Sequence, residues 1–541
     1  MTILPALFSR TLTLTTALSL TFAVGCPAVD ASEATDADDE ESADDAEAPV
    51  VGDDEGPALE RAPGPILDRP DAPGGGVFSP PDAASHPIEQ FADARIVGVD
   101  STQFVGTHVT AGADLNGDGL PDVLTSTIYG PDAVEQAATW AFESPVVGVV
   151  DIHTADGKLM PGPRPGGGFY ATSFEGIGDA DGDGYGEVVL SDSSGSVWTD
   201  YTDALVIFEG PIVGTLTEAN ADALILHEVE GSTDLSVLAN AGDINGDGLT
   251  DLLGGDPYYA SPLDPQGARR GAVWLLLSPL SENESTADAR AMIVGDGASW
   301  EAGRGLAGAG DVDGDGLDDI LIGAPRVADA DGLPSQGRAF LFTSNVEGTI
   351  DVGHADAIVM GDVPAGRLGW DVNGAGDVND DGYDDVLLGA ASGSTYGHPG
   401  AAYLMSGPLS GILGVSDATA TIRGVAAGDA IGTSVDGAGD VDGDGVADIV
   451  ISGLNGAGGP EDGGVVGVYL GPLAGTQRHD DAHLQLHGSD VSGRFGNDVI
   501  GAGDLDGDGL DDLVLGSYRE DVGAAHEAGA TYIIYGVDGG W

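Results

Sequence analysis

Acidic residues recur in a fixed nine-residue pattern through most of the sequence. The pattern is Asp-x-Asp/Asn-x-Asp-Gly-x-x-Asp/Glu, and it begins at Asp114, Asp179, Asp243, Asp311, Asp377, Asp440 and Asp504. Calcium binds about six to eight oxygen ligands, which carboxylates and carbonyls supply. Side-chain oxygens at positions 1, 3, 5 and 9 and the carbonyl of position 7 can surround one ion, and Gly at position 6 allows the sharp turn. We therefore expect Ca2+ in these loops, up to seven ions in all.

The predicted side-chain ligands follow from the pattern. In chain order they are Asp114, Asn116, Asp118 and Asp122; Asp179, Asp181, Asp183 and Glu187; Asp243, Asn245, Asp247 and Asp251; Asp311, Asp313, Asp315 and Asp319; Asp377, Asn379, Asp381 and Asp385; Asp440, Asp442, Asp444 and Asp448; Asp504, Asp506, Asp508 and Asp512. Glu187, and Asp380 in place of the usual fourth-position Gly, should make the second and fifth loops the weakest. Acidic turns without an ion are the alternative, but carboxylates this close would repel one another.

The residues around the loops indicate strands. An EF-hand would place a bidentate Glu at position 12, and none of the seven loops has one. Short apolar runs such as Asp319–Pro325 and Asp512–Gly516 follow the loops, and Gly or Pro ends them. His479, His483 and His487 have a helical spacing, but Leu484–Gly488 aligns with a strand, so a histidine metal site is not favoured. No short catalytic motif is present, and we predict no catalytic residue.

The spacing of the loops predicts the fold. Consecutive loops start 65, 64, 68, 66, 63 and 64 residues apart, which indicates seven copies of one unit. Each unit contains four short apolar runs, as in Asn497–Gly503, Asp512–Gly516, Gly337–Phe342 and Met292–Gly295. Four antiparallel strands make one propeller blade. The sequence therefore predicts an all-β, seven-bladed β-propeller.

The two ends of the repeat region predict how the ring closes. The chain ends at Trp541, soon after the run Ala530–Tyr535, so the last unit has no outermost strand of its own. Gly98 lies 16 residues before Asp114, the same interval that separates the corresponding glycines of later units from their loops. We expect residues near Ala94–Gly98 to supply the fourth strand of the last blade, which removes an open edge.

The N-terminal region reads as an export signal and a tether. Residues 1–25 have the pattern of a signal peptide, with Arg10 followed by the apolar run Thr11–Phe22. Cys26, the single cysteine, stands where a bacterial lipoprotein carries its lipid, so we predict lipidation there; an ordinary secretion signal is the alternative. Residues 26–90 are acidic and then rich in Pro and Gly, which predicts a disordered tether before a propeller at 91–541. The predicted location is the bacterial outer membrane or cell surface, or the medium.

Net charge limits the partners. The chain has 91 Asp and Glu against 17 Lys and Arg, a formal charge of -74. Such a surface repels nucleic acid and anionic lipid, so we expect no nucleic-acid partner and membrane contact only through the lipid anchor. We also expect a monomer.

Further motifs carry a family resemblance. Phe495–Gly496 lies just before the seventh loop, with looser forms at Leu368–Gly369 and Ile431–Gly432, and Gly323–Ala324–Pro325 follows the fourth loop. These units resemble the FG-GAP repeats of integrin α-subunit propellers and of related bacterial surface proteins. The resemblance covers roughly residues 94–541. It implies calcium loops on one face of the propeller and partner binding on the opposite face.

The expected function is adhesion-like binding of an extracellular protein or glycan. The implied partner face contains aromatic residues, Arg and His, namely Tyr258, Tyr259, Arg269, Arg270, Trp300, Arg326, Tyr396, His398, Tyr518, Arg519 and His526. Aromatic residues and Arg are common interface anchors, although each could equally pack a loop. The alternative is an exported carbohydrate-active enzyme with paired carboxylates in the propeller funnel. A structural role in the envelope is a third, less favoured possibility.

Overall fold

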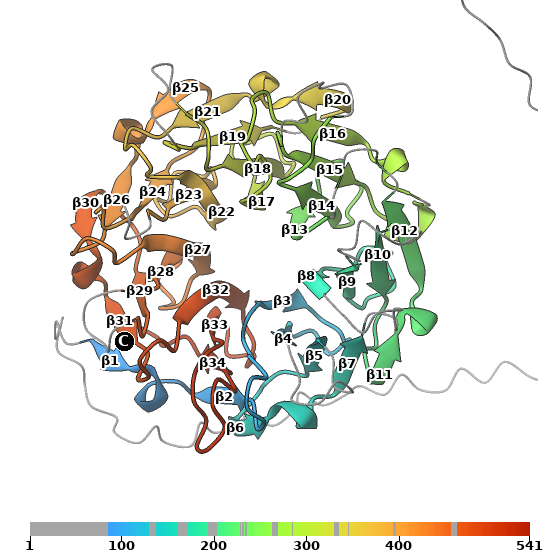
Figure 1. Cartoon of the computed structure of the whole chain (residues 1–541), viewed down its shortest axis with the longest axis vertical. Helices are drawn as coiled ribbons and strands as arrows, with labels where there is room; N and C mark the ends of the chain where they lie inside the picture. The colour runs from blue at the N-terminus through green and yellow to red at the C-terminus, as the bar shows by residue number, and fades with distance from the viewer. Residues whose placement is uncertain are drawn as a thin grey trace, which may run out of the picture. The chain divides into compact units, whose positions relative to one another are not determined.

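The computed structural model describes residues 85–541 with short gaps. The gaps are 129–136, 161–170, 193–202, 228, 230–231, 233–234, 262–268, 284, 329–334, 344–345, 393–396 and 456–461. The predicted signal peptide, Cys26 and the predicted tether as far as residue 84 lie outside the described residues. Within them, seven small sheets stand around a central axis (Figure 1), which confirms the seven-bladed β-propeller. We number the blades one to seven in the order of their acidic loops.

Each blade has four antiparallel strands in chain order, from the axis outward, as predicted. Blade one contains β3 (Val109–Ala113), β4 (Asp122–Thr127), β5 (Ala138–Phe142) and β7 (Gly157–Met160); blade two β8 (Ala171–Ile177), β9 (Glu187–Asp192), β10 (Asp203–Phe208) and β12 (Ala223–His227); blade three β13 (Val237–Gly242), β14 (Asp251–Asp256), β15 (Ala272–Leu276) and β16 (Ala291–Val294). Blade four contains β17 (Leu306–Gly310), β18 (Asp319–Ala324), β19 (Arg338–Phe342) and β21 (Ala357–Met360); blade five β22 (Leu368–Gly376), β23 (Asp385–Ala390), β24 (Ala401–Met405) and β26 (Ala420–Arg423). Blade six contains β27 (Ile431–Gly439), β28 (Asp448–Gly453), β29 (Val465–Tyr469) and β31 (Leu484–His487); blade seven β32 (Phe495–Gly503), β33 (Asp512–Ser517), β34 (Ala530–Ile534) and β2 (Ala94–Val97).

A fifth strand, which the sequence did not predict, joins six of the seven sheets. It comes from the segment that precedes the outermost strand of the next blade, and it pairs in parallel with the outermost strand of the blade it joins. These strands are β11 (Gly214–Thr217) on blade one, β20 (Gly348–Asp351) on three, β25 (Gly411–Gly414) on four, β30 (Gly475–Arg478) on five, β1 (His86–Pro87) on six and β6 (Gly148–Asp151) on seven. On blade two a single parallel bridge, Leu226 to Ser285, takes this place. Each outer edge is thus paired with its neighbour.

Short 3-10 helices lie beside these parallel strands. They are η1 (Ile88–Gln90), η2 (Ile152–Thr154), η3 (Glu218–Asn220), η4 (Leu280–Glu282), η5 (Thr286–Asp288), η6 (Val352–His354), η8 (Val415–Asp417) and η9 (His479–Asp481). Several bury one apolar residue, such as Ile88 and Ile152, beneath the rim of the propeller. Among the described residues, no helix is long and apolar enough to span a membrane.

The ring closes where the start of the propeller meets its end. Strand β2 pairs antiparallel with β34, in the register Ala94 to Ile533 and Val97 to Ala530, which confirms the predicted closure. Strand β1 lies ahead of residue 91, where the propeller was expected to begin, and pairs with β31 of blade six. The segment that contains β1 and β2 therefore pairs with blades six and seven, which the C-terminal part of the chain forms.

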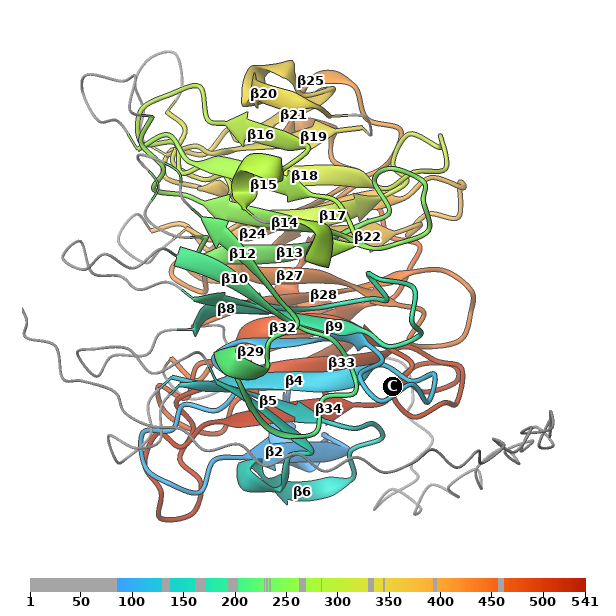
Figure 2. The ribbon, with the colours of Figure 1, turned by 90° about the vertical axis from the view of Figure 1, so that its right-hand side faces the viewer.

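The apolar core lies between neighbouring blades. Figure 2 shows the blades from the side, with their sheets stacked. The second strand of a blade is buried on both faces, and all six residues of β18 are buried. Ile96 of β2 packs in one cluster with Val123 of blade one and Val514 of blade seven. Stability therefore depends on contacts between blades as much as on contacts within one sheet.

Glycine is required where two blades approach most closely. Gly400 has a φ of 78°, and Gly464 has a φ of 87°. A Cβ at either position would collide with the carbonyl oxygen of Ile431 or Phe495, respectively, in the next blade. These contacts explain part of the high glycine content, because no other residue combines this φ with so little space.

The closure can be tested by truncating one buried aliphatic side chain at the junction of the first and last blades. Ile96→Ala should lower the free energy of unfolding by about 2–5 kcal/mol, because it leaves a cavity between the first and last blades. Val149→Ala in β6, where Val149 is 71% exposed, should change it by less than about 0.5 kcal/mol. Urea unfolding of both variants measures the difference. Equal, small effects would show that the junction carries little of the stability.

Candidate metal centres and the channel

Every acidic loop joins the innermost strand of a blade to its second strand. In blade one the loop lies between β3 and β4, and in blade seven between β32 and β33. This arrangement confirms that the loops connect two strands of one blade. Because all seven loops follow equivalent strands, they lie at the same end of the propeller. The connections from the second to the third strands lie at the opposite end.

The first carboxylate of each loop organises the loop backbone. In blade one, Asp114 accepts hydrogen bonds from the backbone N–H of Gly117 at 2.7 Å, Asp118 at 3.1 Å and Gly119 at 2.7 Å. The first Asp makes similar bonds in the other loops, with Gly184 bonded to Asp179 and Gly509 to Asp504, for example. The loop therefore curls around its first residue, which turns the later side chains inward.

The ninth-position carboxylate links three parts of a blade. Asp122 accepts from the N–H of Leu115 in its own loop at 2.9 Å and from the N–H of Ser144 after the third strand at 2.8 Å. Asp512 repeats this with Leu505 at 2.7 Å and Gly536 at 2.7 Å. Burial raises the pKa of these carboxyls, to about 7 for Asp122, about 8 for Glu187, about 6 for Asp251, about 6 for Asp385, about 7 for Asp448 and about 8 for Asp512. A nearby cation would favour their charged form.

Four loops bring at least three carboxylates within 4.8 Å of one another. They are Asp179, Asp181, Asp183 and Glu187; Asp311, Asp313 and Asp315; Asp440, Asp442 and Asp448; and Asp504, Asp506 and Asp512. In blade two, Oε1 of Glu187 is buried and has no hydrogen-bond partner, while Oε2 accepts from Ala180 at 2.7 Å. A free, buried carboxylate oxygen beside three other carboxylates fits a divalent cation, and these side chains would hold it.

The other three loops carry Asn at position 3, and their carboxylates are not among these groups. In blade five, Nδ2 of Asn379 donates to both carboxylate oxygens of Asp385 at 3.2 Å. Asp380 has a φ of 57°, where the corresponding Gly443 of blade six has 77°. Asp adopts this conformation less readily than Gly. The expectation of a weaker fifth loop stays a prediction. The expectation of a weak second loop stays a prediction, although its four carboxylates converge.

Position 8 of the loop has a role that sequence reasoning missed. Asp318, Asp384 and Asp511 each accept a hydrogen bond from the backbone N–H of the first Asp in the preceding loop, at 2.6, 2.8 and 2.8 Å. Burial raises the pKa of all three carboxyls. Neighbouring acidic loops are therefore hydrogen-bonded to each other. An acidic residue at position 8 in three repeats was the available signal.

The three histidines with helical spacing do not form a site. His479 is buried and hydrogen-bonded to the hydroxyl of Tyr469 at 2.8 Å, and burial lowers its pKa to about 4. Nδ1 of His483 accepts from the N–H of Leu470, and His487 contacts the carbonyl of Gly488. Each histidine therefore has its own local partner.

The residues expected on the partner face divide into packed and exposed ones. Tyr259 is buried and packs edge-on against Trp274, and the Trp300 ring stacks on Phe340, so both hold loops in place. The guanidinium of Arg269 lies over Tyr258, which is 40% exposed, and Arg519 lies over Tyr518. Arg326 pairs with Glu301, and His526 with Asp521. Tyr396 lies outside the described residues.

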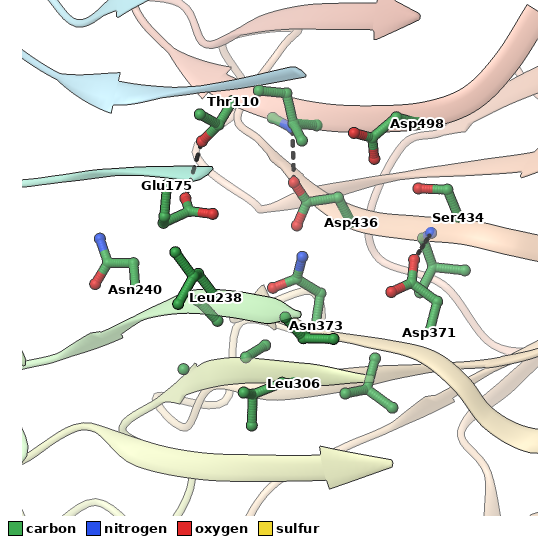
Figure 3. Close-up of a pocket in the computed structure, with 18 of the residues that line it drawn as sticks. Thr110, Glu175, Leu238, Asn240, Leu306, Asp371, Asn373, Ser434, Asp436 and Asp498 are labelled. Carbon is green, nitrogen blue, oxygen red and sulfur yellow. Dashed lines mark hydrogen bonds between the residues drawn. The ribbon is translucent and has the colours of Figure 1, made fainter. Parts of the chain in front are cut away.

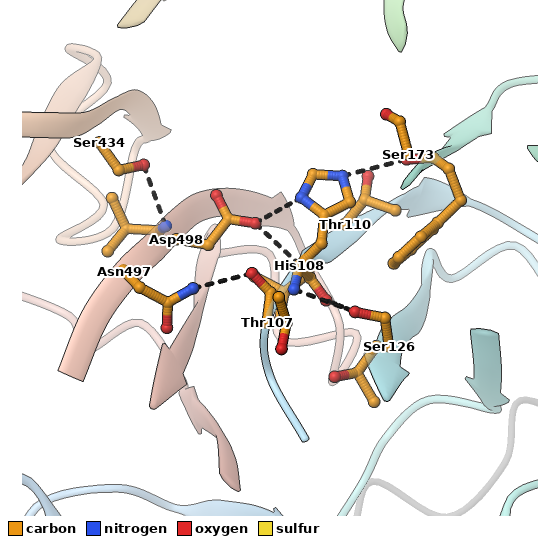
Figure 4. A network of polar contacts seen from close by, with 12 residues as sticks. Thr107, His108, Thr110, Ser126, Ser173, Ser434, Asn497 and Asp498 are labelled. Atoms are coloured by element: carbon orange, nitrogen blue, oxygen red, sulfur yellow. Dashed lines mark hydrogen bonds and ion pairs between the residues drawn. The ribbon is translucent and has the colours of Figure 1, made fainter. Parts of the chain in front are cut away.

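Polar side chains from the innermost strands bridge the blades inside the ring (Figure 4). Oδ2 of Asp498 in blade seven contacts Nδ1 of His108 in blade one at 2.6 Å and accepts from the N–H of Val109 at 2.9 Å. Asp371 accepts from Val435 in the same way, and Ser434 accepts from Val499. These groups lie six residues before an acidic loop. They are hydrogen-bonded connections between consecutive blades.

The fold and the loops define a β-propeller with repeated acidic loops, and comparison with known proteins agrees. The FG-GAP repeat family matches residues 236–276, 302–342 and 496–534, which are parts of blades three, four and seven. Blade three is matched although it lacks a clear Phe-Gly pair. The chain therefore carries FG-GAP repeats, as its motifs predicted.

Integrin alpha subunits are similar to this chain in sequence. Integrin alpha-IIb of Mus musculus is 31% identical over 175 residues, 31% of this chain and 16% of the integrin. The Homo sapiens protein is 32% identical over 171 residues, 30% of this chain and 16% of the integrin. The chain thus matches less than a fifth of the length of these relatives. A solved structure of BBS1N in complex with ARL6DN covers 83% of this chain and 97% of its own, with 10% identity and a TM-score of 0.39.

The buried carboxyls predict how stability depends on pH without metal. The ordinary pKa values are 3.8 for Asp and 4.5 for Glu, and the fold raises them to between about 6 and about 8, so the folded state binds protons more tightly than the unfolded state. This contribution is complete below about pH 4 and is lost as the pH rises through about 6–8. In chelator, the Tm should therefore fall between pH 5 and pH 8. Saturating Ca2+ should reduce that fall; an equal fall with and without Ca2+ would contradict the assignment.

Proposed function

We propose that this protein is an exported, calcium-binding β-propeller that acts as an adhesion-like module for an extracellular protein or glycan. Cys26 would anchor it by a lipid to the bacterial outer membrane or cell surface, or it would be secreted. The observation that carries the proposal is the convergence of carboxylates in repeated loops at one end of a closed propeller. The similarity to integrin alpha subunits supports a binding role.

The calcium would be structural. Each ion would neutralise carboxylates that burial holds partly protonated, and it would fasten the innermost strand to the second strand. Bound ligand stabilises the folded state by RT ln(1 + [L]/Kd), about 2.7 kcal/mol for one site at 100 times its Kd. Because Asp318, Asp384 and Asp511 hydrogen-bond neighbouring loops, we expect metal binding in one blade to support the next.

The partner face would be the end opposite the acidic loops. Exposed Tyr258 with Arg269, and half-buried Tyr518 with Arg519, supply rigid aromatic surface with an attached cation. Such pairs suit contacts with sugar rings or with protein side chains. The charge of -74 makes nucleic acid an unfavourable partner, and we expect the module to work as a monomer.

An exported carbohydrate-active enzyme is the second candidate. The observation in its favour is that Glu175, Asp371, Asp436 and Asp498, from four blades, line one channel. Glycoside hydrolysis needs two such carboxyl groups. Against it, Asp371, Asp436 and Asp498 each accept a backbone N–H of a neighbouring blade, which gives them a structural role.

Calcium binding is tested with Glu187→Gln in blade two. The amide can keep the hydrogen bond from Ala180 but offers no charge, so the variant should lose about one Ca2+ per chain and have a lower Tm in Ca2+. In chelator at pH 8 it should melt no lower than the parent, because one buried charge is gone. Calorimetry and thermal melts measure both. Glu218→Gln, at an exposed position of the same blade, is the control; unchanged Ca2+ stoichiometry in Glu187→Gln would contradict the site.

Partner binding is tested on a glycan and protein array. The calcium-loaded chain should bind a defined set of ligands, and chelator should weaken binding because the propeller loosens. Tyr258→Ala and Tyr518→Ala should each weaken binding about tenfold or more if these residues anchor the partner. Val149→Ala on the rim, which is 71% exposed, is the control. Hydrolysis of an arrayed glycan by the parent would favour the enzyme instead.

A further inference from the structure

The innermost strands enclose a cavity of about 440 Å3 on the propeller axis (Figure 3). Its walls include Thr110, Glu175, Leu238, Leu306, Asp371 and Asp436, which come from six different blades. This volume lies within the range of small-molecule sites, about 300–1,000 Å3. At one end the lining reaches the acidic loops, through Asp318, Gly242 and Gly310.

The cavity has an apolar wall and a polar wall. The side formed by blades three and four is mainly apolar, with Val237, Leu238, Ala239, Leu306 and Ala307, and it also carries Asn240, Arg304 and Asp318. At the equivalent positions, blades five, six, seven, one and two contribute mainly charged or polar side chains. Six residues before the loops these are Asp371, Ser434, Asp498 and His108, and four residues before them Asn373, Asp436, Ile500, Thr110 and Glu175. The repeat is regular in its strands but not in the chemistry of its axis.

Negative groups outnumber positive groups in the cavity. Five carboxyl groups, of Glu175, Asp318, Asp371, Asp436 and Asp498, face two cationic side chains, His108 and Arg304. His108 contacts Asp498 at 2.6 Å, and its pKa is raised to about 9 although burial opposes this, because Asp498 and Glu175 favour the charged ring. Burial raises the pKa of Asp371 to about 7, and the charge of Arg304 opposes this shift. With all five carboxyls ionised, three negative charges remain without a counter-charge.

Among the described residues, Glu175 and Asp436 make no ion pair, whereas Asp498 pairs with His108. Glu175 accepts from the hydroxyl of Thr110 at 2.9 Å and shares His108 with Asp498. Asp436 accepts from the N–H of Gly501 at 2.9 Å, and the other charges that act on it are those of Asp371 and Asp498. Burial raises the pKa of both carboxyls, to about 7 for Glu175 and well above its ordinary value for Asp436. Both would ionise fully beside a cation.

The carboxyls of the cavity do not form a compact cluster of metal ligands. Among the described residues, only acidic loop side chains come within 4.8 Å of one another as groups of three or more metal ligands. A larger cation can reach two of the cavity carboxyls, and its apolar part would contact Leu238 and Leu306 on the other wall.

We propose that the channel binds a small aliphatic diammonium ion, with one ammonium group at Glu175 and the other at Asp436. Thr110, Asn373 and Asn240 line the same space and can accept the remaining N–H groups. The methylene chain would lie against Leu238 and Leu306. This site does not depend on the proposed binding function, and either can fail without the other.

The experiment measures binding of 1,4-diaminobutane to the full chain by calorimetry. Saturating Ca2+ and about 0.15 M salt occupy the acidic loops and screen the surface, and at pH 8 both amines are protonated. We expect one site per chain, affinity about tenfold or more above that of butylamine, and no binding of 1,4-butanediol. Glu175→Gln with Asp436→Asn should weaken binding at least tenfold.

Two further variants make the result decisive. Glu218→Gln with Asp538→Asn removes the same charge from exposed positions and should leave the affinity unchanged. Ala307→Lys places an ammonium group on the apolar wall, so it should abolish diamine binding and raise the Tm. Absence of saturable binding by the parent, or equal weakening by the surface variant, would overturn the proposal. A lower Tm for Ala307→Lys together with retained diamine binding would also overturn it.

Discussion

A ring of sheets leaves no exposed edge only if the last sheet pairs with the first, and this constraint shapes the whole molecule. Strand β2 meets β34 across more than four hundred residues of chain, and β1 reaches one blade further to β31. The parallel strands repeat the same solution around the rim, because each one covers the outer edge of the preceding blade. Blade-to-blade packing then buries the middle strands on both faces.

The acidic loops follow from that architecture. Each innermost strand delivers its loop to the same end, and the ninth-position carboxyl is buried where it can bond both its own loop and the turn after the third strand. Burial of a carboxyl without a cation is unfavourable in its charged form. In each loop the ninth-position carboxyl thus makes structural hydrogen bonds, and a nearby positive charge would stabilise its ionised form. A divalent ion would supply this charge in each blade, and the contacts of Asp318, Asp384 and Asp511 would connect the sites.

Equivalent positions differ more between blades at the axis of the propeller than at its rim. The rim repeats almost unchanged, whereas the positions that face the axis differ from blade to blade. Asp498 and Asp371 use these positions to connect blades. Glu175 and Asp436 lie among the same residues, opposite a mainly apolar side of the cavity. A repeated scaffold has room for such variation because the apolar core lies between the blades.

The sequence by itself determined the number of blades, the strands beside each acidic loop, the predicted ligands from Asp114 to Asp512 and the closing strand at Ala94–Val97. These features repeat at a regular interval or follow local patterns of apolar residues, which a single chain displays directly. Only the tertiary structure decided the parallel fifth strands, the contacts of Asp318 and the meeting of His108 with Asp498. Their partners lie in other blades, and short polar segments carry no local signal of the edge or side chain that they meet.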